Sequence, residues 1–149
     1  MHFLPDTSGL AKRYLHEPGS PHVRALWRDA GNVIHVSQLT RTEFASVLGR
    51  RIRDGTLDRQ GLERASRLFS LHERTRYQHV ALTTAIQFEA ERLLFRHPLR
   101  AADAIQVATA TEVARVLASS GGALTFVTAD QRQATAAAAE GLAVEFVGA

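Results

Sequence analysis

Residues 2–15 read HFLPDTSGLAKRYL and change character after the first four positions. The segment 2–5 is short and mostly apolar, which predicts a brief buried strand, and it runs directly into Asp6. Thr7 or Ser8 can then cap a helix that continues to about the end of the segment. A strand that passes at once into a helix, with an acid at the junction, is typical of an α/β fold.

The same alternation continues along the chain. Further strands are predicted over 33–36, 77–82, 124–127 and, at an edge, 143–147. Helices are predicted over 37–53, 58–75, 84–95, 101–119 and 131–140, together with one that Ser20 caps and Pro21 opens. This order predicts a single α/β domain over residues 1–149, with three layers and a central parallel sheet of four to five strands flanked by helices.

Composition is that of a cysteine-free globular domain. The chain has 149 residues, 45% of them hydrophobic, and no cysteine, which excludes disulfides and thiolate metal sites. We expect a cytoplasmic protein, because a small cysteine-free domain fits a reducing compartment. We expect no membrane segment, because the apolar runs are far shorter than the ~20 residues of a bilayer span. Basic residues outnumber acidic ones 18 to 15, and all except Lys12 are arginine. This bias suits phosphate binding, but a GC-rich genome produces it as well.

Four carboxylates are expected to meet at one edge of the predicted sheet. Asp6 directly follows the first strand, and Asp130 follows the fourth strand by three residues. Glu43 and Asp103 fall within the first two turns of their helices. In parallel α/β sheets, ligands bind beyond the carboxyl ends of the strands, where the strand order reverses. The four acids therefore mark the expected site.

Two of these acids break the polar-outward pattern of their helices. Glu43 lies four residues from both Leu39 and Val47, and Asp103 shares an apolar stripe with Val107. A carboxylate that faces a core is costly unless a partner compensates its charge. A divalent cation among the acids removes that cost, and Mg²⁺ prefers hard oxygen ligands.

Each acid also has a purely structural interpretation. Asp6 and Asp130 can cap the helices that follow them, and Asp103 can interact with a helix dipole. Glu43 can pair with a nearby arginine, either Arg41 or Arg50. The convergence of all four favours a metal site over these separate explanations.

Four motifs resemble those of a known family, the PIN-domain ribonucleases, and in particular VapC-type toxins. They read LPDTSGLAK at 4–12, TEFASVL at 42–48, LRAADAIQVATA at 99–110 and FVTAD at 126–130. Each motif alone is weak, but the set covers almost the whole chain with order and spacing intact.

The resemblance implies a Mg²⁺-dependent endoribonuclease, with Mn²⁺ as an alternative ion, that acts as the toxin of a type II toxin–antitoxin pair. By the same resemblance the acidic metal-site and catalytic residues are Asp6, Glu43, Asp103 and Asp130. Supporting hydroxyls would come from Thr7 or Ser8 and from Thr128, while Arg100 is a candidate phosphate ligand. The implied partners are an RNA substrate, a VapB-type antitoxin and a second copy of the chain.

One departure from the resemblance and two alternative functions stay open at this point. Many relatives carry a further acid shortly after the position of Asp130, where this chain has Gln131 and Gln133, so the number of metal ions is not determined. The chain can also be a non-catalytic PIN-like module that binds RNA or protein. A haloacid-dehalogenase-type phosphatase is less compatible, because that chemistry needs a second aspartate where this chain has Ser8.

Overall fold

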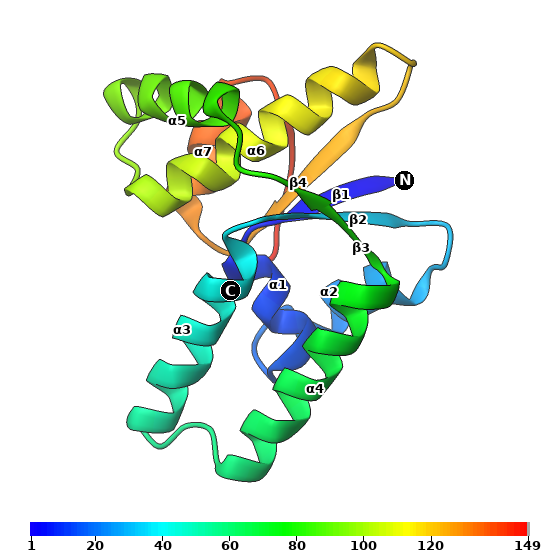
Figure 1. The fold of residues 1–149 in the computed structure, drawn as a ribbon, viewed down its shortest axis with the longest axis vertical. Helices are drawn as coiled ribbons and strands as arrows, with labels where there is room; N and C mark the ends of the chain where they lie inside the picture. The colour runs from blue at the N-terminus through cyan, green and yellow to red at the C-terminus, as the bar shows by residue number, and fades with distance from the viewer. Residues whose placement is uncertain (149) are drawn as a thin grey trace.

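The computed structural model describes residues 1–148, and these form a five-stranded parallel sheet in the order β3-β2-β1-β4-β5 (Figure 1). The strands are β1 (His2–Pro5), β2 (Val33–Ser37), β3 (Tyr77–Val80), β4 (Leu124–Thr128) and β5 (Ala143–Phe146). The chain builds outward from β1 to β2 and β3, and then places β4 on the other side of β1. The strand order therefore reverses between β1 and β4, where a ligand site is expected.

Helices cover both faces of the sheet, as the sequence pattern predicted. They are α1 (Thr7–Tyr14), α2 (Ser20–Arg28), α3 (Thr40–Arg53), α4 (Arg59–Thr75), α5 (Thr84–Arg96), α6 (Ala101–Ala118) and α7 (Gln131–Ala139). Helices α5, α6 and α7 lie on one side of the sheet, while α3 and α4 extend away from it on the other side (Figure 1). The predicted three-layer α/β architecture is confirmed.

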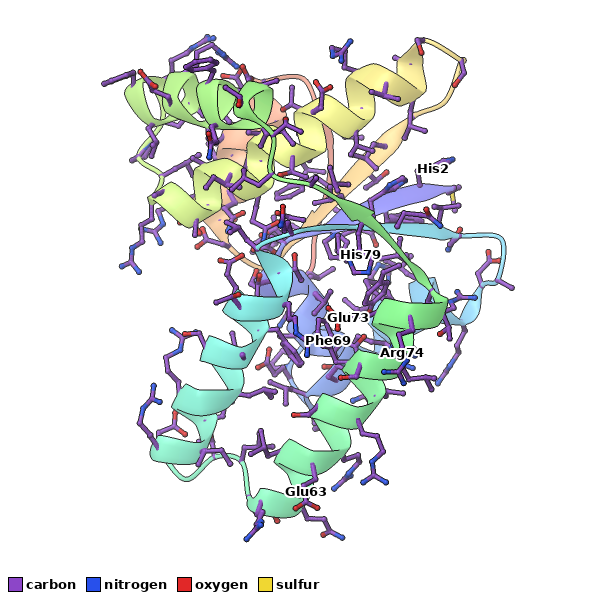
Figure 2. The ribbon with its side chains drawn as sticks, viewed as in Figure 1. His2, Glu63, Phe69, Glu73, Arg74 and His79 are labelled. Carbon is purple, nitrogen blue, oxygen red and sulfur yellow. The ribbon has the colours of Figure 1, made fainter. Side chains whose placement is uncertain are left out.

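Two apolar cores lie on opposite faces of the sheet, because alternate side chains of a strand point in opposite directions. On β1, Phe3 belongs to the core under α1–α4, whereas the next residue, Leu4, belongs to the core under α5–α7. Phe69 of α4 packs against Phe44 of α3 within the first core, and its position between these helices is visible in Figure 2. Both cores hold the strand ends in place around β1.

Helix starts differ from the sequence expectation in three places. Helix α3 begins at Thr40 instead of residue 37, because Ser37 is the last residue of β2. Asp6, rather than Thr7 or Ser8, is the N-cap of α1, since its side chain accepts from the Gly9 backbone N–H. Gly19 precedes α2 in a left-handed conformation, and Ser20 is the first helical residue instead of the cap. The hydroxyls of Thr7 and Ser8 are used by acids of the site described below. Within residues 1–148, every helix is too short or too polar to cross a membrane.

Candidate active site

Three of the four expected acids line one hollow at the carboxyl edge of the sheet. Asp6, Glu43 and Asp103 come from the end of β1, the first turn of α3 and the first turn of α6. The hollow has a volume of about 290 Å³. Its other lining residues are Thr7, Ser8, Ser46, Val47, Arg50, Arg100, Ala102 and Gln133. The fold therefore places three acids that are distant in the sequence at the point where the strand order reverses.

Asp6 is fixed by the junction between β1 and β4. Its backbone N–H donates to the Val127 carbonyl at 3.0 Å, which ties the end of β1 to the neighbouring strand. The start of α1 then lies so close to β4 that a Cβ on Gly9 would stand 2.6 Å from the Val127 carbonyl oxygen. Glycine is required there because any side chain would push α1 away from the sheet.

The carboxylate of Asp6 is buried, with 1% of the residue exposed, and accepts several hydrogen bonds. Donors are the Ser8 hydroxyl at 2.8 and 2.9 Å, the Gly9 N–H at 2.8 Å and the Gln133 amide at 2.9 Å. Burial nevertheless dominates and raises the pKa of Asp6 to about 6, because these donors are neutral and do not replace the lost hydration.

Glu43 is held by neutral donors as well. Its Oε2 accepts from the Thr7 hydroxyl at 2.9 Å and from the side-chain amide of Gln106. Arg41, one of its expected partners, pairs instead with Glu73, which lies on the side of α4 that faces α3 (Figure 2). Among residues 1–148, no salt bridge includes Glu43.

The two carboxylate oxygens of Asp103 accept hydrogen bonds from different elements. Its Oδ2 accepts from the Arg100 backbone N–H at 3.3 Å, which is part of the capping box of α6. Its Oδ1 accepts from the Gln133 amide at 3.1 Å. Neither Asp103 nor Asp6 forms a salt bridge with any of residues 1–148. The two carboxylates share one uncharged donor, the Gln133 amide.

Asp130 does not line this hollow. It is the N-cap of α7, where its Oδ1 accepts from the backbone N–H groups of Arg132 at 2.7 Å and Gln133 at 3.3 Å. The Arg132 guanidinium lies 3.4 Å from its other oxygen. Partial burial acts to raise the pKa of Asp130, but these hydrogen bonds outweigh it and hold the pKa below its ordinary value. The structure thus places Asp130 in its helix-capping role.

The expected supporting residues form a polar chain beside Asp6. The Ser8 hydroxyl, besides donating to Asp6, accepts from the Ala129 backbone N–H at 2.9 Å. The Thr128 hydroxyl lies 3.4 Å from that of Ser8 and accepts from the Asp130 N–H at 3.0 Å. Arg100 is exposed and lines the hollow. These contacts link the ends of β1 and β4 around the acids.

Two glutamines at the site were missed by sequence reasoning. Gln133 is 4% exposed and donates to Asp6 and Asp103, while Gln106 is fully buried and donates to Glu43. An uncharged amide carries no motif signal of its own. The available signal was position: Gln106 lies one helical turn after Asp103, between the apolar residues Ile105 and Val107.

Comparison with protein family models finds a match that covers most of the chain. The family model of the PIN domain matches residues 3–139. The chain belongs to the PIN domain family. This confirms the resemblance of the four motifs at the level of the family, and it excludes the haloacid-dehalogenase alternative.

Several solved structures share the fold of this PIN domain, and one of them is named as a toxin. VapC20 from Mycobacterium tuberculosis, a Sarcin-Ricin loop cleaving toxin, is 19% identical with a TM-score of 0.64, covering 94% of this chain and 95% of that one. VapBC2 from Rickettsia felis, bound to a DNA fragment from its promoter, is 14% identical with a TM-score of 0.61 and 98% coverage of both chains. FitAcB from Neisseria gonorrhoeae is 18% identical with a TM-score of 0.60 and 95% coverage of both. Comparison with curated protein sequences finds no significant match.

The donor set of this PIN domain fits a hard cation that keeps water ligands. No three His, Cys, Asp or Glu side chains of residues 1–148 lie close enough together to hold a metal ion by themselves. Asp6 and Asp103 are nevertheless near enough to share the Gln133 amide, and both lack a protein cation. Mg²⁺ is commonly held by one or two carboxylates while waters or substrate phosphates complete its shell. The chemistry of the hollow therefore suits Mg²⁺ better than an ion that needs a full protein cage.

Proposed function

We propose that this PIN domain is a Mg²⁺-dependent endoribonuclease that acts as the toxin of a type II toxin–antitoxin pair. The observation that carries the proposal is the group of Asp6, Glu43 and Asp103 around one hollow, none of them paired with a cation among residues 1–148. Three carboxylates without compensating charge are costly to fold, so their grouping indicates a positive ligand from outside the chain. Mn²⁺ has similar ligand preferences and is expected to replace Mg²⁺.

Asp6 and Asp103 are the residues that would hold the ion. When bound, Mg²⁺ would polarise a phosphodiester and lower the pKa of the attacking water. Hydrolysis then leaves a 3′-hydroxyl and a 5′-phosphate. Ser8 and Thr7 fix the carboxylates of Asp6 and Glu43 by hydrogen bonds of 2.8–2.9 Å, which keeps both acids in one orientation toward the substrate.

Glu43 is the proposed acceptor for the proton of the attacking water. It lines the same hollow as Asp6, and both of its hydrogen bonds go to Oε2, which leaves Oε1 available to a water. Asp130 contributes indirectly, because it caps α7, the helix that carries Gln133. In this arrangement three acids face the reaction and the fourth positions the helix beside them.

Arginines at the rim of the hollow are the proposed ligands of RNA phosphates. Arg50 and Arg100 are exposed, line the hollow, and take part in no salt bridge within the described chain 1–148. A second hollow of about 370 Å³ shares Ser8, Val47 and Arg50 with the first, so Arg50 lines both hollows. Guanidinium groups along this path suit a phosphate backbone, since arginine binds phosphate oxygens bidentately.

The partner proteins are proposed from the same comparisons. VapC20, which shares this fold, is named as a toxin that cleaves the Sarcin-Ricin loop, and VapBC2, which also shares it, was solved bound to a DNA fragment from its promoter. For this chain we propose a VapB-type antitoxin as inhibitor, a homodimer as the active form, and cytoplasmic RNA as the substrate.

Cleavage of RNA by the purified protein tests the function. Wild type, Asp6→Asn and Asp103→Asn are compared in Mg²⁺, Mn²⁺, Ca²⁺ and EDTA, with folding checked by circular dichroism. We expect cleavage in Mg²⁺ and Mn²⁺ only, and its loss in both folded variants. Cleavage that persists in EDTA or in both variants would contradict the proposal, and absence of cleavage by the wild type would favour the non-catalytic RNA- or protein-binding alternative.

A further inference from the structure

The side-chain amide of Gln133 lies between two carboxylates of the site. Its Nε2 is 2.9 Å from Asp6 Oδ2 and 3.1 Å from Asp103 Oδ1. These are the two acids proposed to hold the cation, and they lie far apart in the sequence. A single NH₂ group therefore stands where a shared positive ligand of the two acids would stand.

The other end of the same amide has no partner. Gln133 is 4% exposed, and its Oε1 is a buried oxygen without a hydrogen bond among residues 1–148. A buried carbonyl without a partner is costly, so hydrogen bonding of the Oε1 atom does not explain this orientation of the amide. The orientation follows from the acids, because turning the amide would place its oxygen against the oxygens of Asp6 and Asp103.

A second glutamine shows the same pattern at the third acid. Gln106 is fully buried, its Nε2 donates to Glu43, and its Oε1 is also unpartnered within the described chain. Two buried amides thus direct their NH₂ groups at carboxylates and leave their oxygens unsatisfied. Neutral donors are the only side-chain partners that Asp6, Glu43 and Asp103 have among residues 1–148.

We propose that Gln133 is a placeholder for the cation: its amide occupies the shared position between Asp6 and Asp103 in the metal-free protein and must leave it when the ion binds. This inference rests on the proposed metal site and adds to it a residue that weakens cation affinity while stabilising the metal-free fold. The physical reason is competition, because ion binding has to break two hydrogen bonds to charged acceptors.

Nuclear magnetic resonance of the wild-type protein tests this displacement without any activity assay. The side-chain NH₂ signals of Gln133, assigned by their loss in Gln133→Met, are followed during a Mg²⁺ titration. We expect them to shift and to exchange faster with water as the site fills. The signals of Gln131, an exposed glutamine on the same helix that contacts Thr135, serve as the matched control and should stay unchanged. Gln133 signals that stay fixed while the protein binds Mg²⁺ would overturn the proposal.

Calorimetric titration of Mg²⁺ into variants measures the competition itself. Methionine resembles glutamine in volume but has no N–H donor, so Gln133→Met should bind Mg²⁺ about tenfold more tightly, equal to ~1.4 kcal/mol. The metal-free variant should also unfold about 5 °C lower, because Asp6 and Asp103 lose their shared donor. Gln131→Met should match the wild type in both measurements. Unchanged or weaker binding by Gln133→Met would overturn the placeholder role, and weaker binding would make the amide a ligand instead.

Gln133→Glu is a second variant, which adds a negative charge where Gln133→Met only removes the N–H donor. A third carboxylate beside Asp6 and Asp103 should lower the melting temperature of the metal-free protein further than methionine does, and should make the recovery in Mg²⁺ larger. If the wild type binds no Mg²⁺ at all, the proposed function fails and the placeholder with it. If the wild type binds Mg²⁺ and both Gln133 variants behave like wild type, only the placeholder fails.

Discussion

Glu140 and Asp6 are both carboxylates with several hydrogen-bond donors, but only Glu140 has cations of the protein beside it. At the end of α7, Glu140 accepts from Arg92 at 2.5 Å and from His97 at 2.7 Å, and Arg96 lies 3.6 Å away. Hydrogen bonds from Arg92 and then His97 lower the pKa of Glu140 to about 2. At the other site, burial raises the pKa of Asp6 to about 6.

The difference between these two sites supports the proposal that the acidic hollow binds a cation. This chain has arginines in abundance and places two of them around a single glutamate when the role is structural. Around Asp6, Glu43 and Asp103 it places amides and hydroxyls, which hold the acids without neutralising them. An acid that already pairs with protein cations has little to offer another cation, whereas these three have no salt bridge among residues 1–148.

The largest expected contrast between the two sites is in activity. Asp6→Asn keeps the cap oxygen for Gly9 but removes the charge, so RNA cleavage should fall about a thousandfold or more. Glu140→Gln should cleave RNA at the wild-type rate and lose about 1–2 kcal/mol of stability, because the charged partners of Glu140 are left without a carboxylate. Cleavage rates and thermal unfolding are measured on both variants. An equal loss of cleavage in the two variants would contradict the functional difference between the two sites.

The metal-free protein should lose stability as the pH rises through the titration of Asp6. Because the pKa of Asp6 is raised, from 3.8 to about 6, the folded state binds the proton more tightly than the unfolded state. The contribution of Asp6 to the free energy of unfolding, roughly 3 kcal/mol, is fully present below pH 4 and is lost by about pH 6 to 7. Urea unfolding in EDTA, with wild type compared to Asp6→Asn across this range, measures it. Saturating Mg²⁺ should remove most of the loss, and a pH-independent difference would contradict the cause given.

Glu140 should show the opposite dependence and a smaller effect. Because the pKa of Glu140 is lowered, its contribution to the free energy of unfolding is present above pH 4.5 and is lost as the pH falls toward 2. We expect about 1–2 kcal/mol, since Arg92 and Arg96 are partly exposed and solvent screens them. The stability difference between wild type and Glu140→Gln should therefore shrink on acidification. A difference that persists at pH 2 would mean that packing, not charge, accounts for it.

Asp130 is the intermediate case and carries the smallest expected effect. It is an acid of the same sheet edge, but it already has Arg132 and two backbone donors. Asparagine caps helices nearly as well as aspartate, so Asp130→Asn should keep cleavage within about threefold of wild type and stability within ~0.5 kcal/mol. The same assays apply. A loss as large as that of Asp6→Asn would place Asp130 among the residues that act on the substrate.

The sequence predicted the sheet well because the strands of a parallel sheet are short apolar runs between helices. All five strands are present, and the acids after β1 and at the start of α6 are where the pattern placed them. Helix caps were less predictable. Asp6, Thr7 and Ser8 can all cap a helix, and the choice depends on tertiary partners: Thr7 donates to Glu43, and Ser8 bridges Asp6 and Ala129.

The glutamines could not be predicted from the sequence for a related reason. An amide is uncharged and occurs on surfaces as readily as in cores, so neither Gln106 nor Gln133 stands out in a pattern of charges and apolar residues. Their role depends on which side chains surround them, and Gln133 contacts Asp6 across 127 positions of the chain. Such contacts come from the assembled sheet edge.

Calorimetric titration of Mg²⁺ into the RNA-free protein tests the central claim most directly. If Asp6 and Asp103 hold a cation, the wild type binds Mg²⁺ while Asp103→Asn, still folded, does not, and Glu140→Gln binds as the wild type does. Equal binding by wild type and Asp103→Asn, or no binding by a folded wild type, would contradict it.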